Sequence, residues 1–291
     1  MQEMTTSDSV RVLRAPPGTS SVPLVLDSPH SGQRYPADFG FACNFARLRR
    51  AEDTDIDDLY AEAPTFGATL ICAEFPRSYL DPNRRVEDFD DTLLDAPWPH
   101  PLDPSPKTRT GIGLIWRVLD DLSPIYARRL NVAEVESRIA RCHAPYWQAV
   151  TAAIEAAHAA HGRVVHLNCH SMPAEAGPLA WVPRGTRFPD VVLGDRDGST
   201  CTPALTALLA AAFRDEGLSV AINDPYKGVE LVKRFGRPAT GRHSIQIEVN
   251  RRLYMNEDTR ERNDSYPALK RTLTRVTARV AAFASDAAAF Y

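Results

Sequence analysis

Short apolar runs that alternate with amphipathic helical patterns are the feature that most constrains the fold of this 291-residue chain. Each run has the length of one strand and ends in polar residues or glycine. The predicted buried strands span residues 22–30, 68–76, 163–170, 218–224 and 243–250. The predicted helices span residues 55–67, 132–162, 202–217 and about 264–286. This alternation predicts one α/β domain over residues 1–291, with a mixed, mostly parallel sheet and helices on both faces.

Proline and glycine mark the expected helix boundaries. Thr202 followed by Pro203 is typical of a helix start, and Gly217 is typical of a helix end. The pattern over 132–162 contains Pro145, which predicts a kink because proline lacks the amide hydrogen that a helix interior requires.

Residues 86–130 follow neither pattern. The stretch is rich in proline, aspartate and tryptophan and includes DAPWPHPLDPSPKTRTGIG. A loop of this length inside a compact domain is usually functional or disordered. We expect a loop insertion that covers a site, and a solvated surface excursion is the alternative interpretation.

Composition excludes several classes of function. The formal net charge of −3 gives no electrostatic reason to expect a nucleic-acid partner. No apolar run is long enough to predict a membrane span, and the N-terminal residues do not resemble a signal peptide. The five cysteines are scattered without a CxxC pair, as is typical of reduced thiols, so we expect a cytoplasmic protein.

Polar side chains follow the predicted strands at the points where they end. His30 follows the first strand, Arg77 follows the second, and Asn168 and His170 end the third. Glu248 lies near the end of the strand over 243–250. Because ligands of open α/β sheets bind at the carboxyl ends of the strands, we expect these residues to meet in one site.

Two histidines at neighbouring strand ends suit a divalent metal, most often zinc. A catalytic zinc takes three protein ligands, so a further residue must complete the set. The acidic run over 52–58 offers candidates, although acidic residues also stabilise a helix start without any metal. His166 lies four residues before His170, which corresponds to about 13 Å along a strand. We therefore interpret His166 as a buried structural histidine.

Glu248 is a charged residue inside the apolar stretch IQIEVN. Glutamate is almost never fully buried unless it has a partner. One interpretation is an ion pair with Arg251 or Arg252. The other, which we favour because the same strand face meets the expected site, is a general base that takes a proton from the attacking water.

Several motifs together resemble the N-formylglutamate amidohydrolase family. The resemblance covers about residues 22–257 and rests on the joint order and spacing of motifs that are weak individually. These are PHSG (29–32), DTD (53–55), SYLDPNR (78–84), NCHS (168–171), LGDRDG (193–198), KGVELVKRFGRP (227–238) and QIEVNRRLYM (246–255). The family is similar in fold to zinc carboxypeptidases, which implies a related fold and chemistry here.

The resemblance implies one zinc ion per chain. His30 and His170 match the two histidine ligands of the carboxypeptidase pattern. That pattern has an acidic ligand three residues after the first histidine, where this chain has Gln33. The acidic ligand is therefore expected in the DTD run, with Asp53 as the first choice and Asp55 as the alternative.

The resemblance also implies roles in catalysis and substrate binding. Glu248 matches the catalytic glutamate and Arg77 the arginine that stabilises the oxyanion. Asn83 and Arg84 match the pair that holds a substrate carboxylate, for which the planar fork of arginine is well suited.

Three further cations are expected to bind substrate. Arg109 and Arg117, in the stretch TRTGIGLIWR, could bind a second carboxylate such as a glutamate side chain, or could be ordinary surface arginines. Lys227 begins the KGVELVKRFGRP motif. There Val229 stands where a second glycine is expected in formylglutamate hydrolases proper, which leaves the N-acyl amino acid open.

The function implied is a zinc-dependent amidohydrolase acting on a small N-acyl amino acid. It removes a formyl or other small acyl group from an amino acid such as N-formylglutamate, and deformylation releases formate. Two alternatives are a metallocarboxypeptidase-like peptidase and a non-catalytic binding module of the same fold. A peptidase needs an open groove, whereas the long segment 86–130 favours a small closed site.

Overall fold

One mixed sheet of eight strands forms the centre of the computed structural model, which describes residues 4–6, 8–180 and 182–290. The order across the sheet is β1-β2-β4-β3-β5-β8-β6-β7. The strands are β1 (Met4–Thr6), β2 (Val10–Leu13), β3 (Leu24–Ser28), β4 (Thr69–Ala73), β5 (Val164–Met172), β6 (Val191–Gly194), β7 (Val220–Ile222) and β8 (Arg242–Asn250). The central strands β4, β3, β5 and β8 are parallel to one another, while β2 and β6 pair antiparallel with their neighbours β4 and β8.

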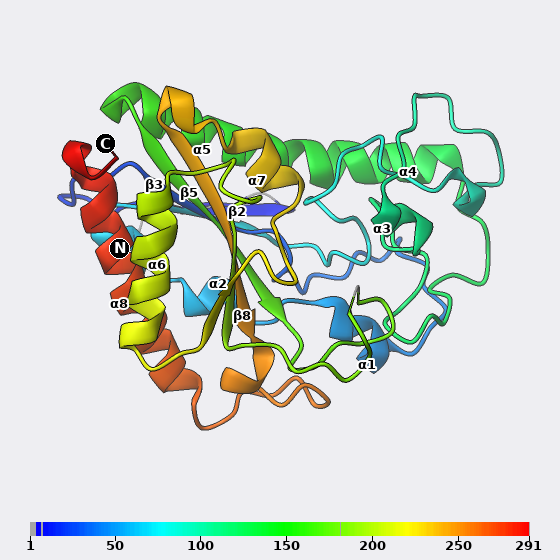
Figure 1. Ribbon diagram of the computed structural model, residues 1–291. Coiled ribbons are helices and arrows are strands. Elements are labelled where there is room, and N and C mark those ends of the chain that lie inside the picture. The colour runs from blue at the N-terminus through cyan, green and yellow to red at the C-terminus, as the bar shows by residue number, and fades with distance from the viewer. Residues whose placement is uncertain (1–3, 7, 181, 291) are drawn as a thin grey trace.

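Helices cover both faces of the sheet, as the α/β prediction requires (Figure 1). On one face lie α4 (Val132–Arg138), α5 (Ala144–His161) and α7 (Glu230–Phe235). On the other face lie α2 (Ile56–Leu59), α6 (Pro203–Asp215) and α8 (Tyr266–Ser285). The short helices α1 (Phe45–Leu48) and α3 (Pro106–Arg109) lie beyond one end of the sheet (Figure 1). Within the described part of the chain, no helix is both long and apolar enough to cross a membrane.

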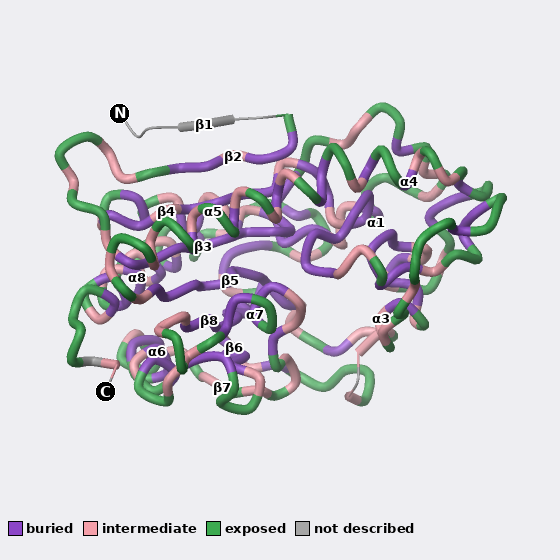
Figure 2. The backbone as a smooth tube through the Cα atoms, turned by 90° about the horizontal axis from the view of Figure 1, so that it is seen from above, coloured by how far each residue is buried: buried purple, intermediate pink, exposed green. Residues whose placement is uncertain are grey.

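The alternation of side chains along β5 explains why its sequence mixes apolar residues with histidine and asparagine. Leu167 and Cys169 point toward the face covered by α6 and α8 and join its apolar core. Successive strand residues point to opposite faces, so His166, Asn168 and His170 point toward the α5 side. Every residue of β5 is buried, and the central strands are buried along their length in Figure 2.

Strand β8 repeats this alternation in register with β5. Ile245 and Ile247 join the same apolar core as Leu167, whereas Gln246 and Glu248 lie on the opposite face. The register pairs Asn168 with Gln246 and His170 with Glu248. A row of polar side chains therefore runs along one face of the two central strands toward their carboxyl ends.

Several predicted elements differ from the structure. The helix expected over 55–67 is divided into α2 and a 3-10 turn, η2 (Ala63–Phe66). The helix over 132–162 is interrupted by a π-turn over 139–143, just before Pro145, whose missing amide hydrogen favours an irregular turn there. The strand over 218–224 is the three-residue edge strand β7, which is only partly buried. The short strands β1, β2 and β6 were not predicted at all.

The segment 86–130 packs against the body of the protein. It contains α3, a 3-10 turn, η3 (Asp91–Leu93), and only isolated β-bridges. Its apolar side chains join the core on the α5 face, and they include Phe89, Trp98, Leu114, Trp116, Ile125 and Leu130. Burial of these side chains favours this ordered path over a solvated excursion.

Gly32, in the PHSG motif, is expected to be required for the close approach of two backbone segments. A Cβ atom on Gly32 would lie 2.3 Å from the carbonyl oxygen of Phe75. The variant Gly32→Ala should therefore lose about 1–3 kcal/mol in the free energy of unfolding, because the backbone must shift. Gly177→Ala is the control, since a Cβ there meets no atom of a described residue within 4 Å. Equal unfolding free energies for the two variants by urea denaturation would contradict this account.

Candidate active site

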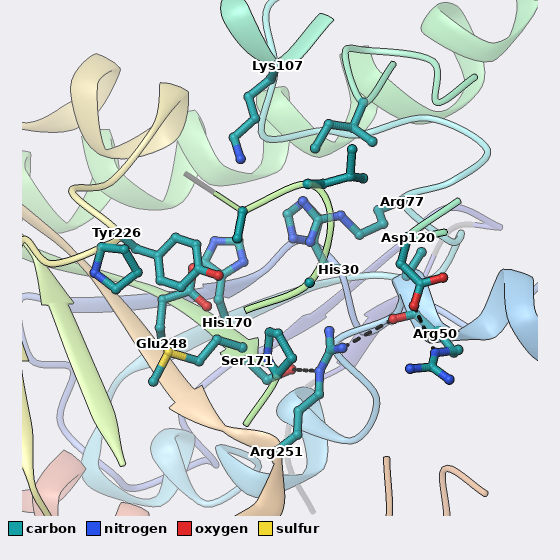
Figure 3. A pocket seen from close by; sticks show the side chains of 18 of the residues that line it. His30, Arg50, Arg77, Lys107, Asp120, His170, Ser171, Tyr226, Glu248 and Arg251 are labelled. Atoms are coloured by element: carbon teal, nitrogen blue, oxygen red, sulfur yellow. Dashed lines mark hydrogen bonds and ion pairs between the residues drawn. The ribbon is translucent and has the colours of Figure 1, made fainter. Parts of the chain in front are cut away.

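A cavity of about 230 Å³ opens at the carboxyl ends of β3, β4, β5 and β8. His30, Arg77, His170 and Glu248 contribute to its lining from these four strands or the residues just after them. Figure 3 shows their side chains pointing into the same space. Four of the strand-end residues expected to meet in one site therefore do so, whereas Asn168 contacts His170 without lining the cavity.

Three buried side chains form a group that could hold a metal ion. Nδ1 of His30 lies 3.3 Å from Oδ2 of Asp53, and Nδ1 of His170 lies 3.1 Å from the same oxygen. One ligand atom from each residue lies within 4.8 Å of the others. Asp55, the alternative acidic ligand, instead pairs with Arg262 at 2.9 Å and is not part of the group.

The second nitrogen of each imidazole has an acceptor of its own. Nε2 of His30 lies 2.7 Å from Oδ1 of Asp81, and Nε2 of His170 lies 2.8 Å from Oδ1 of Asn168. Asn168 is held in this orientation because its Nδ2 donates to Asp27. With a metal ion bound, Nε2 of each ring would donate to its oxygen, and Nδ1 would serve as the ligand atom on the side of Asp53.

Charge states in this group suit a cation. Burial lowers the pKa of His170 to about 4, so its ring is neutral at neutral pH. Burial alone would raise the pKa of Asp53, but the contacts with His170 and His30 and the charge of Arg77 lower it well below its usual range. Two imidazole nitrogens and one carboxylate are ligand types that zinc takes in catalytic sites. A second contact that orients each ligating histidine is also typical of metal sites.

Asp53 is held in place by an arginine from β8's C-terminal turn, η6 (Arg251–Leu253). Nη2 of Arg251 lies 2.9 Å from Oδ1 of Asp53 and donates to the carbonyl oxygen of Glu52 as well. Nε of Arg251 donates to the hydroxyl group of Ser171, which lies 3.2 Å from Oδ1 of Asp53. Arg251 thus neutralises the aspartate on the side away from the two histidines.

Glu248 does not use the ion pairs considered for it. Arg251 pairs with Asp53, and Arg252 pairs with Asp190 at 2.6 Å. Glu248 instead accepts a hydrogen bond of 2.7 Å from Nε2 of Gln246. Burial and the nearby charge of Asp53 raise the pKa of Glu248 well above its usual value. Glu248 is thus a buried carboxyl group with a raised pKa, and it lies beside His30, Asp53 and His170, the metal-capable group. Such a carboxyl group is suited to accept and return a proton.

Arg77, Asn83 and Arg84 also line the cavity. Nη2 of Arg77 lies 3.0 Å from Oδ2 of Asp81, and its guanidinium lies over the ring of Trp116. No described residue forms a hydrogen bond with its buried Nε. Nη1 of Arg84 donates to the carbonyl oxygen of Asn83, and Nη2 lies 3.8 Å from Asp81. Asp81 thus orients His30 and holds both arginines.

Three sequence-predicted binding residues lie elsewhere. Arg109 is exposed, Arg117 pairs with Asp90 at 3.0 Å, and Lys227 pairs with Asp197 at 2.9 Å. None of the three lines the cavity. Three cations that do line it were not identified from sequence patterns: Lys107 comes from the segment 86–130, and Arg47 and Arg50 come from α1 and the turn that follows it.

The segment 86–130 meets the segment that contains α1 at the cavity. Arg50, in the 3-10 turn after α1, pairs with Asp120 at 3.0 Å, and Arg47 pairs with Asp121. Lys107, Trp116 and Asp120 make this segment part of the cavity wall.

Comparisons with known proteins agree with this geometry. The model of the N-formylglutamate amidohydrolase family matches residues 22–255. An N-formylglutamate deformylase from Pseudomonas aeruginosa is 29% identical over 81% of this chain and 83% of the relative. The crystal structure of an N-formylglutamate amidohydrolase from Ralstonia eutropha is 49% identical, with a TM-score of 0.91 over 95% of this chain and 98% of that chain. A gene product from Agrobacterium tumefaciens, 20% identical with a TM-score of 0.63 over 93% of this chain and 95% of that chain, shares the fold.

Adjacent arginines allow a test of the charge balance around Asp53. Arg251→Met should cost about 3–5 kcal/mol in unfolding free energy, because it leaves a buried carboxylate without its cation. Arg252→Met should cost less than about 1 kcal/mol, since this side chain is half exposed in its pair with Asp190. Chemical denaturation at pH 7 measures both values. Similar losses would mean that Arg251 contributes no more than a surface ion pair.

Proposed function

The chain belongs to the N-formylglutamate amidohydrolase family, and we propose that it is a zinc-dependent amidohydrolase that deformylates N-formylglutamate or a similar N-acyl amino acid. The observation that carries the proposal is that His30, Asp53 and His170 form one group that could hold a metal ion, and that its two histidines line the same cavity as Glu248. The names of the relatives, N-formylglutamate deformylase and amidohydrolase, support the substrate class.

On this proposal, His30, Asp53 and His170 hold one zinc ion per chain. The set is a suitable one, since two neutral imidazoles and one carboxylate leave a fourth position open for catalysis. When bound, zinc supplies Lewis acidity and lowers the pKa of water from 15.7 to roughly 7. Asp81 and Asn168 keep the two rings in the required orientation through their Nε2 contacts.

Glu248 then moves the proton. Its carboxylate takes a proton from the attacking water, and the resulting acid delivers that proton to the leaving amine. The raised pKa favours the second step, because the protonated form is stable long enough to serve as a donor. The hydrogen bond from Gln246 orients the carboxyl group for both steps.

Two arginines act on the substrate. Arg77 faces the oxyanion that develops at the formyl carbonyl. Its buried Nε, which has no hydrogen-bond partner among the described residues, provides a donor for it. Arg84 and Asn83 hold the α-carboxylate, so the substrate is oriented with its formyl group toward Glu248. Arg77 is fixed beforehand by Asp81 and the Trp116 ring, so little reorganisation is needed in the transition state.

The size of the cavity favours a small substrate over a peptide. A volume of about 230 Å³ is enough for an amino-acid derivative, and the segment 86–130 supplies one wall through Lys107, Trp116 and Asp120. We propose that this segment covers the site in a single domain of 1–291. Retention of both Glu248 and the metal-capable group favours an enzyme over a non-catalytic binding module.

The first prediction of the proposal concerns zinc. Purified protein should contain about one zinc per chain, and His170→Ala should lose it on dialysis because one of three ligands is missing. His100→Ala is the control, since His100 is exposed and pairs with Glu136. Asp81→Asn should retain zinc with an affinity reduced roughly 10- to 100-fold, as expected for a residue that orients a ligand. Mass-spectrometric metal analysis decides this, and full occupancy in His170→Ala would disprove the ligand set.

The second prediction concerns turnover. The wild-type enzyme should release formate from N-formyl-L-glutamate, and Glu248→Gln should reduce kcat by about 10²–10⁴-fold with its zinc content unchanged. The substitution keeps the shape of the side chain and removes only the proton acceptor. Near wild-type turnover in this variant would assign Glu248 a structural role. Absence of formate release by the zinc-loaded wild type would reject the proposed function.

A further inference from the structure

Gln246 has a side-chain oxygen, Oε1, that is buried without a hydrogen-bond donor among the described residues. The side chain lines the cavity, and only 3% of the residue is exposed. The nitrogen of the same amide group is in use, because Nε2 donates to Oε1 of Glu248 at 2.7 Å. The ionised carboxylate of Glu248 only accepts hydrogen bonds, so the amide of Gln246 turns its nitrogen toward Glu248 and its oxygen away. A buried acceptor without a donor is rare in proteins and calls for an explanation.

Asn83 also lines the cavity with an amide side chain, and it provides a comparison within the same site. Its Nδ2 donates to Oδ1 of Asn168 at 3.3 Å, and its Oδ1 accepts from the amide of Leu231 at 3.0 Å. Both atoms of this amide thus have partners within the protein. Gln246 differs in that only its nitrogen has one.

Two buried side-chain atoms of the cavity lining have no partner in the described part of the chain, namely Oε1 of Gln246 and Nε of Arg77. The first is an acceptor and the second is a donor. A secondary amide presents the complementary pair, since its carbonyl oxygen accepts and its nitrogen donates. Both residues are also close to Glu248, Gln246 through its hydrogen bond and Arg77 through its charge. The scissile amide must lie in the same place, because its nitrogen receives a proton from Glu248.

We propose that Oε1 of Gln246 accepts the N–H group of the scissile amide, and that this contact makes the enzyme select secondary amides over substrates that lack the N–H group. The inference rests on the proposed function, in which Glu248 delivers a proton to the leaving nitrogen. Nε2 and Oε1 belong to one planar group, so Gln246 holds Glu248 and the substrate nitrogen beside each other.

The contact also orients the nitrogen for its departure. In the tetrahedral intermediate the nitrogen carries one hydrogen and one lone pair. With the hydrogen bound to Gln246, the lone pair is turned toward Glu248, which is the geometry that proton transfer requires. The proton of Glu248 then forms a new N–H bond, the C–N bond breaks, and its electron pair stays on the nitrogen.

The substrates that this contact disfavours are esters and tertiary amides, such as the N-formyl derivatives of imino acids. Neither class has an N–H group, so either would leave Oε1 of Gln246 buried without a donor. A site built to form a hydrogen bond with an N–H group discriminates against the analogue that lacks it.

The kinetic test replaces the N–H group by an oxygen atom. N-formyl-L-glutamate and its ester analogue, the formate ester of L-α-hydroxyglutarate, have nearly the same shape, and kcat/KM is measured for both with zinc-loaded protein. Gln246→Met should lower kcat/KM roughly 10- to 100-fold more for the amide than for the ester. The hydrogen bond to Glu248 is lost for both substrates, so the difference between them reports on Oε1. Gln148→Met, the same change at an exposed glutamine of α5 outside this cavity, is the control and should behave as wild type.

Equal losses for the two substrates would overturn the proposal, because Gln246 would then act only by orienting Glu248. Circular dichroism melting of each variant confirms that folded proteins are compared.

A binding measurement separates the contact both from proton transfer and from the proposed function. Zinc-loaded Glu248→Gln lacks the proton acceptor, so the dissociation constants of the amide and the ester can be measured by titration calorimetry without turnover. This protein should bind the amide about tenfold more tightly or better, and adding Gln246→Met should remove the difference. Equal affinities before that second substitution would already contradict the contact, as would a preference that persists after it. If the wild type releases no formate but the preference follows this pattern, the deformylase proposal fails and the role of Gln246 stands.

Discussion

The buried carboxylate of Asp53 connects the parts of the site that are most distant in the sequence. It contacts His30 after β3, His170 on β5 and Arg251 after β8, and Arg77 lies 3.9 Å away. A buried charge is tolerated only with such partners, so each contact stabilises the position of the others. His30 and His170 contact Oδ2 of Asp53, and Arg251 contacts Oδ1. The position and charge of Asp53 in the group with His30 and His170 therefore depend on Arg251.

The central sheet and the strand-end residues could be predicted from the sequence because they depend on local patterns. The apolar runs of β3, β4, β5 and β8 alternate with helices, and parallel strands bring their carboxyl ends to one edge. His30, His170 and Glu248 follow directly from that rule. Asp53 was chosen from an acidic run only with the help of a family resemblance, since a helix start attracts acidic residues anyway.

The remaining parts depend on tertiary contacts that no local pattern reveals. Strands β2 and β6 are only four residues long, and they are defined by the antiparallel neighbours with which they pair. In the segment 86–130, burial of Ile112 and Trp116 turns Lys107 toward the cavity and leaves Arg109 exposed. From the sequence alone, Arg109 and Arg117 were the candidates from this segment, and Lys107 was not considered. Which cation faces inward is decided by how the apolar residues around it pack.

Charge balance in the cavity connects the fold to the choice of substrate. Asp53 and Asp81 are both kept ionised, each with a pKa well below its usual range despite burial, and arginines lie close to both. The remaining wall is largely apolar and includes Met172, Leu179 and Val229. An apolar wall excludes water, and each charge interaction inside is stronger for that reason. Arg77, Arg84 and Lys107 place three cations in the wall of the same cavity, so its electrostatic interaction with an anionic substrate is favourable.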